Sequence, residues 1–295
     1  IKKTFCVKVK MSCRPFIRWV GGKNLLLKNL KPLVDSIDLS ANKYIEPFIG
    51  GGSLFLSGIK AQSHIINDLN SDLSFCYQLL SSDETFNSLV VELSDPKYIN
   101  DKPTFVLMKS RFNELKKGNV QSIERSALFI YLNYLCFNGF YIESKRTGIY
   151  NSGFGYRTTL RWPGLCIDRL TTVRNYLSDR NTVVCNKDYS EILKVARKGD
   201  LIYLDPPYFD CNTFTSYTQK QFDTQSQIDL VDWCDRLDKL GCYIVYSNNN
   251  KQFIKDLFDK LGGKWKCAEF TVNRVVSCKI NGRQNSKNEL IITNF

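Results

Sequence analysis

Short apolar runs recur in the first quarter of the chain and again in its last half, with helix-like patterns between them. Their length and their polar flanks predict strands. The predicted strands are residues 43–48, 64–68, 182–188, 200–205, 242–249 and 289–295. Residues 225–241, "QSQIDLVDWCDRLDKLG", carry apolar positions three and four apart and predict a helix that ends at Gly241. Strands that alternate with helices indicate an α/β sheet covered by helices on its faces.

The pattern changes in the middle of the chain. Residues 122–137 predict an amphipathic helix capped by Ser122. Residues 138–158, "NGFYIESKRTGIYNSGFGYRT", are rich in Gly, Asn, aromatic and basic residues and have no helical period. We therefore predict one α/β domain formed by residues 1–70 and 166–295, interrupted by an insertion at residues 71–165.

Composition adds the expectation of a globular protein with a sizeable core, since 43% of the 295 residues are apolar. No stretch approaches the ~20 apolar residues of a membrane span, and the basic start has no apolar run typical of a secretion signal. We expect an intracellular protein without a membrane partner. The 41 Lys and Arg against 29 Asp and Glu give a formal charge of +12, which suits either solubility or a polyanion such as nucleic acid.

Cysteine and histidine usage argues against metal chemistry. The eleven cysteines are scattered without any C-x-x-C pair, which indicates reduced and mostly buried thiols. The single histidine, His64, excludes a His-rich metal site and is expected at a strand edge. We expect no metal ion.

A glycine triplet follows the first predicted strand in "YIEPFIGGGSLFL", residues 44–56. The strand leads from Glu46 into Gly50, Gly51 and Gly52, whose missing side chains would let the backbone approach a ligand. Ser53 is then expected to open a helix whose free N–H groups face that ligand. Downstream, Asp68 ends the next strand, near the position from which an acidic residue holds ribose hydroxyls in nucleoside-binding α/β folds.

A second candidate site is "LDPPY", residues 204–208. A carboxylate at the carboxyl end of a strand points into the ligand crevice of an open α/β sheet, and two prolines fix the backbone after it. The Asp205 side chain and the Pro206 carbonyl would then be two fixed acceptors beside the aromatic face of Tyr208. This arrangement suits a planar base with an exocyclic amino group. In a third segment, "FIRWVGGKNLL", Trp19 and Lys23 flank a Gly-Gly bend before a predicted helix.

The segments "WVGGK", "EPFIGGGS", "IINDLN", "NKDY", "LDPPY" and "YSNN" occur in this order. Together they resemble the Dam-type DNA adenine-N6 methyltransferases, and the resemblance extends over nearly the whole chain. It implies a Rossmann-like class I methyltransferase sheet with helices on both faces. It also implies that the insertion is a mainly helical DNA-recognition domain with a hairpin loop.

The resemblance implies S-adenosylmethionine as cofactor. Each part of the cofactor would be bordered by its own set of residues. These are Glu46, Phe48, Gly50, Gly52 and Ser53 at the methionine part, Asp68 at the ribose, Asp188 and Tyr189 at the adenine edge, and Trp19 and Lys23 at the amino-acid end. Asp205 is also expected among the cofactor-binding residues. Lys23 is expected to pair with the cofactor's carboxylate.

The implied reaction is direct methyl transfer to an adenine amine flipped out of double-stranded DNA, with Asp205, Pro206 and Tyr208 as the catalytic residues. Phe137 and Asn138 match the hairpin position that reaches into the opened base stack. Arg18 is expected to read a guanine, which favours a GATC-like target.

At the hairpin position where GATC-modifying relatives carry an arginine, this chain has Ile142. Either Lys145 or Arg146 substitutes for it, or the outer guanine is read loosely or not at all, so we predict a target with GAT at its core and relaxed discrimination at the distal base pair. We expect a monomer or weak dimer on DNA. The alternatives are the same chemistry on RNA or on a protein glutamine, and a non-catalytic DNA-binding relative.

Overall fold

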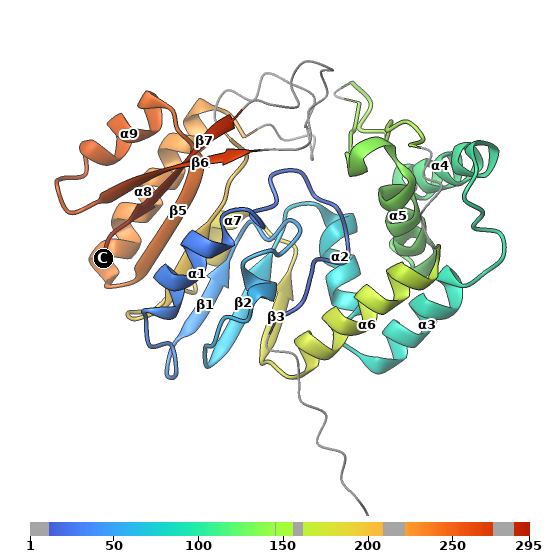
Figure 1. Ribbon diagram of the computed structural model, residues 1–295, viewed down its shortest axis with the longest axis horizontal. Helices are drawn as coiled ribbons and strands as arrows, with labels where there is room; N and C mark the ends of the chain where they lie inside the picture. The colour runs from blue at the N-terminus through green and yellow to red at the C-terminus, as the bar shows by residue number, and fades with distance from the viewer. Residues whose placement is uncertain (1–11, 145, 156–161, 209–221, 274–285) are drawn as a thin grey trace, which may run out of the picture.

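The computed structural model describes residues 12–144, 146–155, 162–208, 222–273 and 286–295 (Figure 1). These residues contain a seven-stranded sheet in the order β3-β2-β1-β4-β5-β7-β6. Strands β1 to β5 run parallel, and β7 is antiparallel to both of its neighbours. The strands are β1 (Lys43–Glu46), β2 (Ser63–Asn67), β3 (Thr182–Cys185), β4 (Leu201–Leu204), β5 (Tyr243–Asn249), β6 (Lys266–Asn273) and β7 (Ser286–Thr293).

All six strands predicted from the sequence are confirmed, but the prediction missed β6. Among the described residues this strand pairs with β7 alone, and Lys266 to Glu269 are all exposed. This half of the strand therefore has no alternation of buried and exposed positions to detect. Strand β1 ends at Glu46, two residues before the predicted end, because Pro47 has no N–H to donate to the ladder.

Helices cover both faces of the sheet, as predicted. Along β1 and β4 successive side chains enter two different cores: Tyr44 and Leu201 lie in one, Ile45 and Ile202 in the other. The first core also holds α1 (Leu27–Asp35) and α2 (Ser71–Leu79), and the second holds α7 (Tyr189–Leu193), α8 (Thr224–Leu240) and α9 (Gln252–Asp259). Gly241 ends α8 in the left-handed conformation, as expected.

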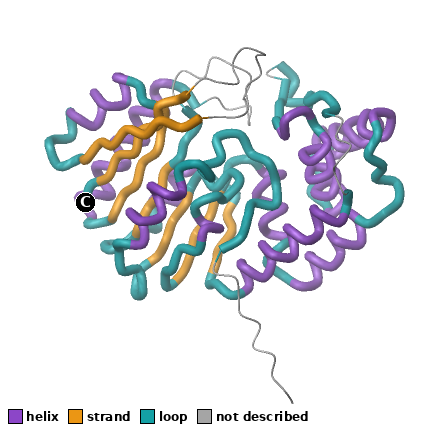
Figure 2. Tube along the Cα trace, in the orientation of Figure 1, coloured by secondary structure: helices purple, strands orange, loops and turns teal. Residues whose placement is uncertain are grey.

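The helices α3 (Asp83–Leu93), α4 (Lys102–Lys117), α5 (Ile123–Leu135) and α6 (Gly164–Ser178) gather beside the sheet, as the separation of helix and strand colours in Figure 2 shows. Helices α2, α3 and α4 all contact α5. The Ser122 side chain caps α5 by accepting the Arg125 N–H, as predicted. The predicted amphipathic character is wrong, because every residue from Arg125 to Leu135 is buried. A helix enclosed by neighbours on all sides needs no polar face.

A paired loop leaves the end of α5 and returns at residue 155; we call residues 136–155 the 136–155 loop. Its base is closed by the Phe137 N–H, which donates to the Gly153 carbonyl, and by a β-bridge between Cys136 and Phe154. A second bridge joins Glu143 to Tyr150. The loop is therefore a hairpin in outline, as expected. In the described part of the chain, no helix is long and apolar enough to cross a membrane.

Candidate active site

Four carboxylates lie at the carboxyl ends of the parallel strands. Glu46 ends β1, Asp68 follows β2, Asp188 follows β3 and Asp205 follows β4. Because β1 to β4 are parallel, their carboxyl ends meet at the same edge (Figure 1). In open α/β sheets this is the edge that binds ligands.

Asp205 forms a buried ion pair with Lys23. The Lys23 ammonium donates to both Asp205 carboxylate oxygens, at 2.5 and 2.7 Å, and to the Gly21 carbonyl at 3.0 Å. The same ammonium lies 4.7 Å from the centre of the Tyr208 ring, a cation–π contact. The Lys23 side chain is only 4% exposed and that of Asp205 18%. The structure therefore joins "WVGGK" to "LDPPY", whereas the sequence had predicted the cofactor's carboxylate as the partner of Lys23.

A buried side-chain cluster supports the turn after Asp205. Gln227 of α8 donates its amide N–H to the Pro207 carbonyl at 2.8 Å. The oxygen of the same amide accepts the Tyr246 hydroxyl at 2.9 Å and the Asn248 amide at 3.3 Å. The "YSNN" segment of β5 thus fixes the diproline turn through α8. Sequence reasoning did not identify Gln227.

Glu289 is a second residue that sequence reasoning missed. It lies in β7, is 1% exposed and accepts a hydrogen bond from the Tyr208 hydroxyl. One end of the Tyr208 ring is therefore anchored on the antiparallel strand, while the Lys23 ammonium lies over its face. The signal in the sequence was an acidic residue at the start of an otherwise apolar strand, "ELIITNF".

Glu46 is buried next to this ion pair. It accepts the Tyr44 hydroxyl at 2.7 Å. Burial raises the pKa of the Glu46 carboxyl well above its usual range, and the Asp205 carboxylate raises it further. The Tyr44 hydroxyl opposes both effects. Lys23 itself donates its hydrogen bonds to the two Asp205 oxygens and to the Gly21 carbonyl.

Backbone angles and close neighbours explain why glycine occupies positions 50 and 52 of the glycine loop. Gly50 and Gly52 have φ angles of +48° and +71°, which only glycine adopts easily. A Cβ at Gly50 would lie 2.8 Å from the Trp19 ring, and one at Gly52 would lie 2.6 Å from the Tyr77 hydroxyl. The missing side chains thus make room for two protein side chains, Trp19 and Tyr77. Trp19 is brought onto the loop, as its place in the predicted site required.

The helix expected from Ser53 is also wrong, because only a 3-10 turn at Phe55–Ser57 follows. Ser53 itself is buried close to the Gly-Gly bend, with its hydroxyl oxygen 3.7 Å from a Cβ built on Gly22. No regular helix N-terminus therefore faces the ligand edge at this point.

Asp68 holds the glycine loop in place. Its two carboxylate oxygens accept the backbone N–H groups of Gly50 and Asn70 at 3.0 and 2.9 Å. Burial raises the pKa of Asp68 to about 6 although both hydrogen bonds oppose the shift. The structure gives Asp68 a role in the loop's conformation that sequence reasoning did not foresee.

Three aromatic side chains pack together next to Asp188. Phe48 packs on Tyr189 with ring centres 5.4 Å apart, and Phe222 contacts both rings. Asp188 caps α7 by accepting the Ser190 N–H at 3.0 Å. Phe48, expected at the methionine part of the cofactor, therefore lies beside Tyr189, expected with Asp188 at the adenine, and Phe222 joins them.

The residues expected at DNA are also gathered. The Arg18 backbone exchanges two hydrogen bonds with the Asn133 side chain, and the Arg18 side chain packs on Gly139 in the 136–155 loop. In the same loop Asn138 has a φ angle of +57°, and Phe137 is 58% exposed. Arg146 is exposed in the turn at the far end, while Lys145 lies outside the described residues.

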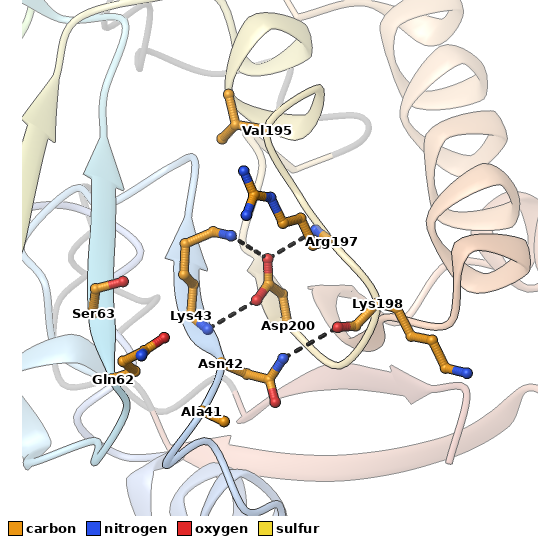
Figure 3. Close-up of a pocket in the computed structure, with 9 residues that line it drawn as sticks. All are labelled: Ala41, Asn42, Lys43, Gln62, Ser63, Val195, Arg197, Lys198 and Asp200. Atoms are coloured by element: carbon orange, nitrogen blue, oxygen red, sulfur yellow. Dashed lines mark hydrogen bonds and ion pairs between the residues drawn. The ribbon is translucent and has the colours of Figure 1, made fainter.

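A cavity of about 430 Å³ lies at the opposite edge of the sheet (Figure 3). The Asp200 carboxylate accepts the Lys43 ammonium, the Lys43 N–H and the Arg197 N–H, each at 2.8 Å. These contacts join the start of β4 to the start of β1. Because the whole of β4 separates Asp200 from Asp205, this cavity lies at the opposite end of the strand from the candidate ligand site.

His64 is the second residue of β2, near the expected strand edge, and its ring lies 3.1 Å from the Ile59 carbonyl in this inner strand between β1 and β3. Its buried place in an inner strand gives it a packing role. Among the residues that the structure describes, no group of three or more His, Cys, Asp or Glu side chains could hold a metal ion.

Comparison with known proteins identifies the family. The family model of the D12 class N6 adenine-specific DNA methyltransferases matches residues 19–273. The chain is 30% identical to Type II methyltransferase M.MjaIII of Methanocaldococcus jannaschii, over 97% of this chain and 100% of that protein. It is 28% identical to Type II methyltransferase M1.LlaDCHI of Lactococcus lactis subsp. cremoris, over 98% of both chains. It is also 28% identical to the DNA adenine methylase of Haemophilus influenzae, over 88% of this chain and 87% of that protein. The chain therefore belongs to the D12 class of N6 adenine-specific DNA methyltransferases and is an adenine-specific DNA methyltransferase.

Proposed function

We propose that this enzyme methylates the amine of an adenine flipped out of duplex DNA, within a GATC-like site, with S-adenosylmethionine as the methyl donor. The observation that carries the proposal is the position of Asp205 and Tyr208 at the carboxyl end of β4. They lie there beside Lys23 and Glu46. This position favours an amine substrate, because a carboxylate accepts N–H groups.

The donor set at the neighbouring strand ends fits a nucleoside-containing cofactor. Asp68 can accept from ribose hydroxyls, and the Phe48–Tyr189 pair offers an aromatic surface beside Asp188 for an adenine ring. S-adenosylmethionine, when bound, supplies a methyl group on a positively charged sulfur. The amino-acid end of the cofactor would lie near Trp19 and Ser53, where the glycine loop and the Gly-Gly bend meet.

At the target amine, the protein's contribution is positioning and electrostatics. Asp205 and the Pro206 carbonyl each accept one N–H, so that the nitrogen lone pair is directed at the methyl group. Tyr208 stacks on the base, with its ring held by Glu289 and its face already occupied on one side by Lys23. No covalent intermediate with the protein is needed.

DNA recognition is assigned to the insertion at residues 71–165 together with Arg18. Arg18 reads the guanine before the target adenine, and Phe137 with Asn138 fills the gap left by the flipped base. Ile142 cannot donate hydrogen bonds to a guanine, so the proposed target has GAT at its core and relaxed discrimination at the last base pair. The Asn133 side chain and Gly139 support this assignment, since they fix Arg18 beside the 136–155 loop.

The test is methylation of plasmid DNA, read at single-base resolution and checked by mass spectrometry of the nucleosides. We expect N6-methyladenine in sites that contain GAT. Asp205→Ala protein should give no signal above background. Methylation without guanine immediately 5′ of the adenine would refute the Arg18 assignment, and the absence of N6-methyladenine would refute the proposed function.

A further inference from the structure

Helix α4 holds the 136–155 loop along one face. Lys109, Asn113 and Lys116 are four and three residues apart, so their side chains project from the same side of the helix. Lys109 donates to the Ser152 carbonyl at 3.3 Å. Asn113 exchanges two hydrogen bonds with the Tyr150 backbone, at 3.0 and 2.9 Å. The helix thus satisfies backbone groups of the returning half of the loop.

Lys116 holds the outgoing half of the loop through charge. Its ammonium donates to Glu143 at 2.5 Å, to the Tyr141 hydroxyl at 2.9 Å and to Asp72 at 3.3 Å. Tyr141 in turn donates to Glu143 at 2.6 Å. Asp72 also accepts from Arg125 at 2.7 Å, so the cluster contains two carboxylates and two cations.

The charges in this cluster depend on one another. Asp72 and Glu143 are both buried, and Lys116 contacts both of them. A buried carboxylate without its cation is costly, so the outgoing half of the loop is stable only in the position that keeps Glu143 on Lys116. Within the described contacts the loop is therefore fixed in register against α4 on both of its halves.

The position of the loop along α4 also affects the residues proposed to read DNA. The Tyr141 ring stacks on Trp19 with centres 5.7 Å apart and an interplanar angle of 27°. Arg18 precedes Trp19, and its side chain packs on Gly139, two residues before Tyr141. A shift of the loop along α4 would move Gly139 and Tyr141 together, and with them the surface that supports Arg18.

We propose that the Lys109–Asn113–Lys116 face of α4, acting through Glu143 and Tyr150, is the positioning element of the DNA-reading loop and sets the enzyme's discrimination between target sequences. The inference rests on the proposed function, because it assigns DNA reading to Arg18 and the 136–155 loop. Asn113, Lys116 and Glu143 are positioning residues, which act on DNA through the loop.

Two variants and a matched control test the proposal. Asn113→Ala removes both hydrogen bonds to the Tyr150 backbone without changing charge. Glu143→Gln removes the charge that Lys116 holds, while keeping the shape of the side chain. The control is Glu124→Gln, because Glu124 pairs with Arg111 at 2.8 and 3.0 Å and joins α4 to α5 instead of to the loop.

Two measurements are made on each protein: amide hydrogen exchange of residues 137–155, and kcat/KM on the preferred duplex and on duplexes with one base pair changed. We expect faster exchange of the loop amides, by about fivefold or more for each broken hydrogen-bond pair. We expect the ratio of kcat/KM between preferred and changed duplexes to fall by about tenfold, because small displacements of a reading group are costly. Glu124→Gln should match the wild type in both measurements.

Faster loop exchange with an unchanged discrimination ratio would overturn the proposal, since it would reduce α4 to a structural support. Unchanged exchange in both variants would overturn it as well. A wild-type protein that methylates no duplex would instead refute the proposed function. In that case the exchange data would still show whether α4 holds the loop.

Discussion

Replacement of Asp205 by Ala tests catalysis and stability together, because Asp205 is both the candidate acceptor and the partner of a buried lysine. Removing it leaves the Lys23 ammonium with the Gly21 carbonyl and the Tyr208 ring. Breaking a buried ion pair on one side costs about 3–5 kcal/mol, and the 18% exposure of Asp205 favours the lower end. We expect a loss of about 3 kcal/mol, which lowers the midpoint of thermal unfolding by about 6 °C in a chain of this size.

The same substitution should lower single-turnover methyl transfer by a factor of at least about 10², the effect of removing one group that stabilises the transition state. The double variant Lys23→Met with Asp205→Asn removes both charges and should regain stability to within about 1 kcal/mol of the wild type, but not activity. Calorimetry and a rapid-quench methylation assay measure the two effects separately. An Asp205→Ala protein as stable as the wild type would refute the ion pair, and one with near-normal turnover would refute the acceptor role.

Three further predictions concern the candidate site and the reading of DNA. Burial raises the pKa of Asp68 to about 6 in the folded protein, so the free energy of unfolding of the wild type falls as the pH rises from about 4 through 6. The stability of Asp68→Asn relative to wild type should therefore increase between about pH 4 and pH 7 in urea titrations, and a constant difference would contradict the shifted pKa. Tyr208→Phe and Glu289→Gln should each slow methyl transfer, and the double variant should be no slower than the worse single variant; additive losses would show that the hydrogen bond between them is not used. Arg18→Ala should cost on the order of 1–3 kcal/mol in discrimination at the guanine 5′ of the adenine, measured as kcat/KM ratios, and an equal loss on all sequences would make Arg18 a phosphate contact instead.

The sequence predicted the parallel part of the sheet because its strands are buried and therefore apolar. The same signal located the strand ends that carry Glu46, Asp68 and Asp205. It failed at β6, whose exposed edge needs no apolar residues. It also failed for the amphipathic character of α5, because the neighbours that bury this helix are far away in the sequence.

The contacts that complete the site could not be predicted from the sequence, because they join residues that are far apart in the chain. Glu289 meets Tyr208 because β7 turns back antiparallel beside β5, and Gln227 meets Pro207 because α8 packs on the same strand. Neither pairing leaves a local pattern. The glycine loop at residues 50–52 was recognised, but the close approach of Trp19 to Gly50 and of Tyr77 to Gly52 was not, since these side chains come from distant parts of the chain.

The Lys23–Asp205 pair also restricts how a base amine can reach its acceptor. A neutral amine cannot displace an ammonium from a buried carboxylate, because the charged hydrogen bond is the stronger one. A carboxylate has about four acceptor positions on its two oxygens, however, and Lys23 now contacts both oxygens at 2.5 and 2.7 Å. In the proposed reaction, a small rotation of the Asp205 carboxylate would leave Lys23 on one oxygen and present the other oxygen to the base. Lys23 would then keep its contact with the carboxylate and its place over the Tyr208 ring, so the proposed site would need no large rearrangement to bind a target amine.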